Sequence, residues 1–194
     1  MITNLRGKRG KVVDFNIDEH ARPKTTMESL GNLPSVFKKD GTVTAGNASG
    51  IVDGAAAIVL ATEKSVKENN LTPLARLAAF SYVGCDPKIM GEGPVHAINE
   101  IYKIAGVQKN DIGIFDINEA FATQWEACRQ QLDIDPEIIN ICGGAIALGH
   151  PLGASGTRIT MNLAYSLQRE NKKYAIGSAC IGGGQGIAVL LEKC

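Results

Sequence analysis

Three residues with chemically reactive side chains fall where predicted strands end. Asn118 closes the apolar run IFDIN, and Cys180 closes the run YAIGSAC. His150 lies in a glycine-rich loop, CGGAIALGHPLGASG, that follows the predicted strand EIINIC. Because ligands of α/β proteins bind at the carboxyl ends of the strands, we expect these three side chains to converge on one site.

Such a site could carry out acid–base or nucleophilic chemistry at a carbon or sulfur centre. A thiol reacts as its thiolate, and an unperturbed pKa of about 8.5 leaves only a few per cent of a cysteine ionised at pH 7. Lowering that pKa by about 1.5 units takes roughly 2 kcal/mol, which a nearby imidazolium or backbone amides could supply. The glycines beside His150 and Cys180 would leave room for a ligand and free N–H groups for a developing oxyanion.

Each of the three residues also has a purely structural interpretation. Asn118 could cap a helix that begins at Glu119, His150 could lie at the surface, and Cys180 could be a buried apolar residue. Taken together, with glycines beside the last two, the three residues favour the functional interpretation.

The chain lacks the motifs of several common sites. GNASG and GASG do not have the G-x-S-x-G spacing of a hydrolase, GHPLGASGTR lacks the Lys-Ser/Thr of a phosphate-binding loop, and G-x-G-x-x-G does not occur. The five cysteines form no C-x-x-C pair and are odd in number, which argues against a disulfide framework or a zinc site and for a reducing compartment. We therefore expect no bound metal. The remaining histidines and cysteines are interpreted as structural or surface residues: His20, His96, Cys85, Cys128, Cys142 and Cys194.

Composition and charge argue against two classes of partner. The 194 residues carry 20 basic and 20 acidic side chains, so no overall field favours nucleic acid or an anionic membrane. The basic cluster RGKRGK at 6–11 could contact phosphates, but short basic runs are usually solvated. No apolar run approaches the roughly 18 residues that a membrane span needs. We expect neither a nucleic-acid partner nor a membrane-spanning segment.

From residue 73 onward, strand and helix patterns alternate in the order β-α-β-α-β-α-β-β. This order predicts an α/β fold, with a mostly parallel sheet and helices on its faces. Pro94 in a first turn and Gly106 as a stop mark one of the helices. The predicted strands are 73–84, 112–118, 137–142, 174–180 and 186–193, and the predicted helices are 94–106, 119–132 and 157–171.

The residues before 73 predict little regular structure. Thr25 and Glu28 form a T-x-x-E capping box, which indicates a short helix. The run GAAAIVLAT at 54–62 predicts a small strand, and a short helix is expected at 63–69. Because one or two isolated strands cannot build a sheet, we expect residues 51–72 to expose an apolar edge.

Four ordered blocks of the sequence resemble those of the thiolases. NEAFA (118–122), GGAIALGHPLGASG (143–156) and CIGGGQG (180–186) are similar to the three C-terminal signature blocks of that family. DEHARP, together with KDGTVTAGNASGIVDGAAA, is similar to the segment just upstream of them. The likeness covers nearly the whole chain, and within the family it is nearest to mitochondrial-type 3-ketoacyl-CoA thiolases.

The resemblance implies a fold and a division of the chain. Residues 73–194 would form a thiolase-like C-terminal half, an α/β domain with a mixed sheet and helices on its faces. An incomplete N-terminal and loop region would precede it. In that region, 51–72 would be the last elements of the thiolase N-terminal domain, and 1–50 a remnant of the region that carries the CoA-binding loop.

The resemblance also implies an activity. Thiolases cleave a 3-ketoacyl-CoA with coenzyme A, or condense two acyl-CoAs in reverse, as in fatty-acid β-oxidation. A nucleophilic cysteine takes the acyl group, and a second cysteine, here Cys180, acts as acid and base. His150 would activate the nucleophile and donate to the thioester oxygen. Asn118 would hold a water that completes this oxyanion hole, and the Gly182 N–H would contribute to a second one.

Coenzyme A is a substrate in this chemistry, so the resemblance implies no cofactor. Ser49, Ala45, Ala120 and Phe121 would line the channel for its pantetheine arm. The family also implies a homo-oligomer for the full-length enzyme and a mitochondrial matrix location, with the peroxisome or cytosol as alternatives.

One departure from the family pattern matters for activity. The family's nucleophilic cysteine lies in the first half of its duplicated core, in a Cys-Ser/Gly-rich motif at a helix N-terminus. None of the other four cysteines of this chain lies in such a motif. We therefore expect the chain by itself to be unable to turn over 3-ketoacyl-CoA.

Two other functions fit some of these features. The chain could be a non-catalytic thiolase-derived fragment that binds coenzyme A or another thiolase subunit. It could also use Cys180, His150 and Asn118 as a papain-like hydrolase. That design often places the cysteine at a helix N-terminus, whereas Cys180 precedes a glycine turn between two predicted strands, so we disfavour it.

Overall fold

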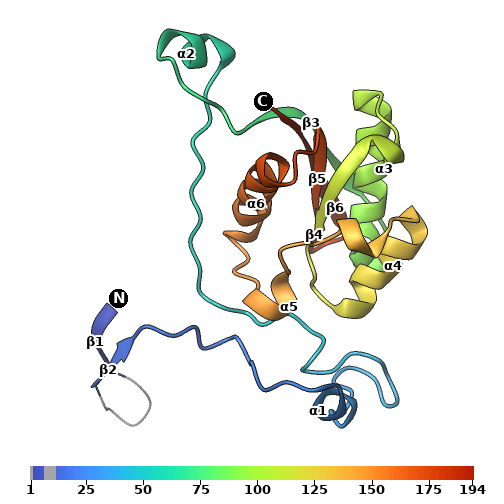
Figure 1. The fold of residues 1–194 in the computed structure, drawn as a ribbon. Coiled ribbons are helices and arrows are strands. Elements are labelled where there is room, and N and C mark those ends of the chain that lie inside the picture. The colour runs from blue at the N-terminus through green and yellow to red at the C-terminus, as the bar shows by residue number, and fades with distance from the viewer. Residues whose placement is uncertain (1, 7–11) are drawn as a thin grey trace.

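A mixed four-stranded sheet, in the order β3-β6-β5-β4, forms the centre of the fold (Figure 1). Strands β4 and β5 run parallel, while β6 is antiparallel to both of its neighbours, β5 and β3. The strands are β3 (Ala75–Gly84), β4 (Ile112–Ile117), β5 (Tyr174–Ile181) and β6 (Gln185–Lys193).

The mixed α/β sheet is confirmed, but the expectation of a mostly parallel one is wrong. Only the β4–β5 pair is parallel. Strand β6 follows β5 through a tight glycine turn, which forces an antiparallel hairpin, and β6 then lies between β5 and β3.

Helices cover both faces of this sheet, with α3 and α4 on one side and α6 on the other (Figure 1). Neighbouring residues along a strand therefore enter different cores, as the period of two requires. Phe115 and Ile176 pack with the core under α3, whereas Ile114 and Ala175 pack under α6. The helices are α3 (Gly93–Ala105), α4 (Ala122–Leu132), the short α5 (Ala145–Leu148) and α6 (Ser155–Arg169).

Helix α3 begins and ends as its sequence predicts. Pro94 stands in the first turn, where its missing N–H costs no hydrogen bond. Gly106 ends the helix with a left-handed backbone, φ 65°, which suits glycine because it has no Cβ. Two 3₁₀ turns lie on either side of α3: η2 (Pro87–Glu92) and η3 (Lys109–Asp111).

The predicted strand at 137–142 is wrong. Its first part is a 3₁₀ turn, η4 (Pro136–Ile138), and only Ile139 pairs with β4, in a single parallel bridge to Phe115. Asn140 then takes a left-handed backbone, φ 51°. Its side-chain amide accepts from the Ile117 N–H at 3.0 Å and donates to the Ile117 carbonyl at 2.9 Å. One side chain thus occupies the place that a further strand residue would fill.

The structure describes residues 2–6 and 12–194. Strands β1 (Ile2–Arg6) and β2 (Val12–Phe15) form a separate antiparallel pair. The possible phosphate contact of the basic cluster at 6–11 cannot be placed, since residues 7–11 lie outside the described residues.

Two short helices precede the sheet: α1 (Met27–Gly31) and α2 (Glu63–Glu68). Helix α2 confirms the predicted short helix. The capping box of α1 lies one residue later than predicted, because Thr26 and not Thr25 is the cap. The Thr26 hydroxyl accepts from the Ser29 N–H at 3.1 Å, and the Ser29 hydroxyl accepts from the Thr26 N–H at 3.0 Å, so Ser29 replaces the expected Glu28.

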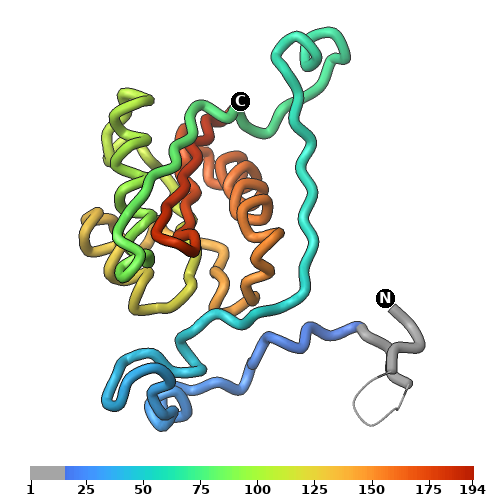
Figure 2. The backbone as a smooth tube through the Cα atoms, turned by 180° about the vertical axis from the view of Figure 1, so that it is seen from behind, coloured from blue at the N-terminus to red at the C-terminus, as the bar shows by residue number. Residues whose placement is uncertain are grey.

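The predicted strand at 54–62 is also wrong. Residues 51–61 form a long extended segment that passes along the outside of the molecule (Figure 2). Within the described part of the chain, their N–H groups donate no backbone hydrogen bond. Val59 and Leu60 are 94% and 80% exposed. The sequence has strand propensity, but a strand forms only where a neighbour pairs with it.

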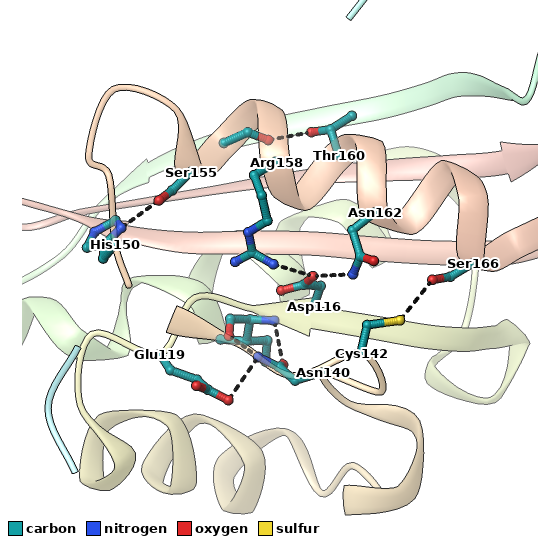
Figure 3. Close-up of polar contacts among 12 residues, drawn as sticks. Asp116, Glu119, Asn140, Cys142, His150, Ser155, Arg158, Thr160, Asn162 and Ser166 are labelled. Atoms are coloured by element: carbon teal, nitrogen blue, oxygen red, sulfur yellow. Dashed lines mark hydrogen bonds and ion pairs between the residues drawn. The ribbon is translucent and has the colours of Figure 1, made fainter. Parts of the chain in front are cut away.

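A buried ion pair joins the sheet to α6 (Figure 3). Asp116 on β4 is 1% exposed, and its Oδ2 accepts from Arg158 Nη1 at 3.1 Å and from Asn162 Nδ2 at 2.9 Å. Burial raises the pKa of Asp116, and Arg158 opposes that rise. Both partners come from consecutive turns of α6, so this contact sets the position of the helix along β4.

We expect Arg158→Met to cost about 3–5 kcal/mol of unfolding free energy in urea, because it leaves a buried carboxylate without its cation. Adding Asp116→Asn should recover part of that loss, since the double variant no longer buries an unpaired charge. Lys103→Met is the control, because Lys103 pairs with Glu100 at the surface and should change stability by less than about 1 kcal/mol. A double variant less stable than Arg158→Met would contradict this account of the pair.

We expect amides of residues 53–61 to exchange with solvent within the dead time of a hydrogen-exchange measurement. Among the residues that the structure describes, these N–H groups have no backbone hydrogen-bond partner, and the segment lies at the surface. Amides of β5, in the centre of the sheet, serve as the protected reference. Slow exchange of 53–61 in a monomeric sample would show that this segment is paired in solution.

Candidate active site

The carboxyl ends of β4 and β5 place Asn118 and Cys180 on the same edge of the sheet. Asn118 directly follows β4, and its N–H donates to the Ser178 carbonyl of β5 at 2.9 Å. Cys180 lies two residues further along β5. The Asn118 side chain is only 1% exposed, and its Oδ1 has no hydrogen-bond partner among the described residues. That oxygen is therefore available to accept a hydrogen bond at the edge of the site.

His150 meets Asn118 at this edge. Its Nε2 lies 3.4 Å from Asn118 Nδ2. His150 reaches the edge from the loop between α5 and α6, and its N–H donates to the Gly50 carbonyl at 2.8 Å. This contact agrees with the predicted convergence of His150 and Asn118, although the loop of His150 follows a single bridge and not the expected strand.

The second ring nitrogen of His150 contacts Ser155, the first residue of α6 (Figure 3). Nδ1 lies 2.6 Å from the Ser155 hydroxyl, which in turn donates to the Pro151 carbonyl at 3.1 Å. Sequence reasoning missed Ser155. Its one sequence signal is its position in GASG, five residues after the histidine and two before the predicted helix 157–171.

Burial sets the charge of His150. It lowers the pKa of the imidazole, and the positive charge of Arg158 lowers it further. The ring is therefore neutral near pH 7, with one nitrogen free to accept a proton.

Cys180 differs from the sequence expectation. The nearby imidazolium that would lower its pKa is not formed, because His150 is neutral, and among the described residues no hydrogen bond joins the two side chains. Burial instead raises the pKa of the Cys180 thiol, and Cys85 adds to the rise. Cys180 is therefore a protonated thiol near neutral pH, ready to donate a proton.

The glycine turn after Cys180 combines an open position with a closely packed one. Nothing lies within 4 Å of the place where a Cβ of Gly182 would be. Gly184 has a left-handed backbone, φ 85°, and its carbonyl accepts from the Cys85 N–H at 2.8 Å. A Cβ at Gly184 would meet the Cys85 backbone. The turn thus leaves open space at Gly182, and nearly so at Gly183, but not at Gly184.

Two of the glycines before His150 are required by close packing, whereas Gly153 and Gly156, after it, lie beside open space. A Cβ at Gly149 would overlap the side chain of Val52, and one at Gly144 would overlap the carboxylate of Glu119. That carboxylate accepts from the Ile146 N–H at 3.1 Å and from Asn140 Nδ2 at 3.2 Å. Glu119 therefore holds the histidine loop against the end of β4, a role that sequence reasoning missed.

The residues expected to line a CoA channel partly come together. Both the hydroxyl and the N–H of Ser49 donate to the Ala120 carbonyl, each at 3.1 Å. The Phe121 ring packs edge-on against Phe37, with centroids 5.6 Å apart. Ala45 lies exposed in a separate turn and shares none of these hydrogen bonds.

The remaining histidines and cysteines agree with a structural or surface role. His20 Nε2 donates to the Ile146 carbonyl at 3.1 Å, which ties the N-terminal arm to the histidine loop. Cys128 is buried, and burial raises its pKa to about 11. Cys142 is exposed, and its sulfur accepts from Arg169 Nη2 at 2.9 Å.

Within residues 2–6 and 12–194, no three or more His, Cys, Asp or Glu side chains are grouped so that they could hold a metal ion. No helix of the described chain has both the length and the apolar character to cross a bilayer.

Comparison with known proteins identifies the family. Residues 71–193 match the family model of the thiolase C-terminal domain, and residues 2–64 match that of the thiolase N-terminal domain. The chain is 57% identical over 189 residues to the mitochondrial 3-ketoacyl-CoA thiolase of Mus musculus, covering 97% of this chain and 47% of that protein. It is 44% identical over 189 residues to the acetyl-CoA acetyltransferase of Paracoccus denitrificans, covering 97% of this chain and 48% of that protein.

Solved structures agree with this assignment. Human mitochondrial 3-ketoacyl-CoA thiolase in complex with CoA matches with a TM-score of 0.90 and 57% identity, over 93% of this chain and 46% of that one. The acetyl-CoA acetyltransferase of Bacillus anthracis matches with a TM-score of 0.91 and 45% identity, over 97% of this chain and 48% of that one. The chain spans about half the length of the curated relatives it matches. In sequence and in fold alike, the chain belongs to the thiolase family.

Proposed function

We propose that this chain supplies the acid–base residues of a thiolase-type acyltransferase, which cleaves 3-ketoacyl-CoA with coenzyme A or condenses acyl-CoAs in reverse. The observation that carries this proposal is the contact between a neutral His150 and the buried Asn118, at the sheet edge that also holds Cys180. A base, an amide and a protonated thiol at one edge suit a reaction with two proton transfers.

In the first half-reaction, His150 Nε2 accepts the proton of the nucleophilic cysteine thiol. The resulting thiolate forms a bond to the keto carbon of the substrate, whose oxygen becomes an oxyanion. Two donors stabilise that oxyanion: the protonated His150 Nε2, and a water that Asn118 Oδ1 holds. When the oxyanion collapses, the bond between the keto carbon and the α-carbon breaks, and the acyl group stays on the cysteine as a thioester.

Cys180 completes both half-reactions. The α-carbon leaves as the enolate of acetyl-CoA and takes the Cys180 proton, which a raised thiol pKa keeps in place until then. The Cys180 thiolate then removes the proton of an incoming CoA thiol, and the CoA sulfur attacks the thioester. Acyl-CoA is released, while the nucleophilic cysteine leaves as a thiolate and takes its proton back from His150 Nε2. The Gly182 N–H, beside open space, would stabilise the enolate oxygen.

The proposal treats coenzyme A as a substrate and requires no metal or other cofactor. Ser49, Ala120 and Phe121, with Ala45 further along the loop, would line the pantetheine channel. A human relative crystallised with CoA supports this ligand class. Because several relatives are named as mitochondrial enzymes, we propose the mitochondrial matrix as the location, and a homo-oligomer as the assembly of the complete enzyme.

The nucleophile of this reaction is not one of the chain's own cysteines in our interpretation. Cys85 and Cys128 lie near Cys180 but not in the family's nucleophile motif, and Cys128 is buried with a pKa of about 11. A second candidate function follows from this: the chain binds coenzyme A or a thiolase subunit without catalysing turnover by itself.

We expect the purified chain to show no sustained loss of the acetoacetyl-CoA chromophore when it is incubated with coenzyme A. The reason is that none of the chain's other cysteines lies in the family's nucleophile motif. The full-length mouse relative is the positive control. Sustained turnover that Cys180→Ala abolishes would show that one of the chain's own cysteines acts as the nucleophile.

Calorimetric titration with coenzyme A separates the two candidate functions from an inert fragment. Binding without turnover supports the CoA-binding function for the chain alone. Turnover that appears only when a nucleophile-bearing thiolase N-terminal half is added, and that His150→Gln abolishes, supports the acyltransferase proposal.

We expect His150 to titrate with a midpoint below the ordinary value of 6.5 in an NMR pH series. Burial and the charge of Arg158 both disfavour the imidazolium, so the neutral base persists as the pH falls from 7 toward 6.5. The resonance is assigned by its loss in His150→Gln. A midpoint at or above 6.5 would contradict a neutral base at this position.

A further inference from the structure

Ser155 is buried beside the histidine of the site in a position that no substrate would need to touch. It is 4% exposed and is the first residue of helix α6, whose Arg158 and Asn162 make the buried contacts to Asp116. Its hydroxyl oxygen lies 2.6 Å from His150 Nδ1 (Figure 3). The contact with Asn118 is made by the other ring nitrogen, Nε2. Ser155 therefore contacts the site only through His150.

The Ser155 hydroxyl can keep both of its hydrogen bonds with only one tautomer of the neutral His150 ring. Ser155 Oγ donates its single hydrogen to the Pro151 carbonyl at 3.1 Å. It must then accept from His150, so the proton of the neutral ring lies on Nδ1. If Nδ1 carried no proton, the hydroxyl would have to turn toward the ring and leave the Pro151 carbonyl.

The contact on the other side of the ring selects the same state. Asn118 Nδ2 lies 3.4 Å from Nε2, and an amide nitrogen can only donate. With the amide in this orientation, the contact uses the lone pair of Nε2. With a proton on Nε2, two donors would face each other on this side, while the Ser155 bond would be lost on the other.

We propose that Ser155 is a positioning residue that holds His150 in the tautomer with its proton on Nδ1, so that Nε2 is the atom that accepts a proton. That Nε2 takes its proton from a nucleophilic thiol rests on the proposed function. The assignment of the tautomer does not depend on the proposed function. The arrangement follows the rule that the hydrogen bond at one ring nitrogen decides what the other can do.

The tautomer is measured directly with a long-range ¹H–¹⁵N correlation spectrum of the ¹⁵N-labelled chain, above pH 7, where His150 is neutral. We expect the Nδ1–H form in the native chain. Ser155→Ala removes the acceptor, so the His150 signals should move toward the Nε2–H form. Ser155→Cys, with a weaker acceptor, should give a smaller shift in the same direction.

Thr160→Val is the matched control. Like Ser155, Thr160 lies on α6 and donates its hydroxyl to the carbonyl four residues earlier, that of Gly156, at 2.8 Å, but it does not contact His150. This variant should leave the His150 signals unchanged. Effects of equal size in Thr160→Val and Ser155→Ala would mean that a general loosening of the helix is responsible, and would overturn the proposal.

Two further results would overturn the inference. One is an Nε2–H tautomer in the native chain. The other is an unchanged tautomer in Ser155→Ala when the amide signals of β5 show an intact sheet. If the Nδ1–H tautomer is found, but the assembled enzyme turns over at the same rate with His150→Gln, the positioning inference stands and the proposed function fails.

Discussion

Strands β4 and β5 lie side by side and run in the same direction, and the positions of the candidate catalytic residues depend on that pairing. It brings the ends of two distant segments to one edge, where the Asn118 N–H donates to the Ser178 carbonyl. The tight turn after β5 then returns the chain as β6, between β5 and β3. Cys180 therefore lies just before the turn at which the chain reverses direction from β5 to β6. One glycine of that turn, Gly184, is required by close packing against the Cys85 backbone.

Buried polar contacts of α6 extend this geometry to the histidine. Asp116 on β4 sets the helix position through Arg158 and Asn162, and the first residue of the same helix, Ser155, contacts His150. A buried carboxylate without its partners is costly, so the helix cannot slide along the strand without penalty. The distance between Asn118 and His150 is thus determined by contacts that lie outside the site itself.

The sequence predicted the elements that carry local signals and failed where structure depends on distant partners. Helix α3 was predicted at both ends, because Pro94 and Gly106 act on their own backbone. The strand expected at 137–142 is replaced by a bridge and an Asn140 side chain, which no periodicity encodes. The segment 54–62 has the composition of a strand but no strand pairs with it in the described chain. Asn118 and His150 were predicted to meet, whereas Ser155 and Glu119 act through contacts that only the fold reveals.

Burial favours the uncharged forms of the two candidate acid–base groups: it lowers the pKa of His150 and raises that of Cys180. A cysteine and a histidine in contact would instead be expected to form a thiolate–imidazolium pair, as in cysteine hydrolases. The neutral state leaves a base on one side and an acid on the other, which suits a reaction that removes one proton and delivers another. It also argues against the papain-like alternative, because a protonated Cys180 without a hydrogen bond to His150 is a poor nucleophile. In this resting state Cys180 carries its proton, and His150 has a free lone pair.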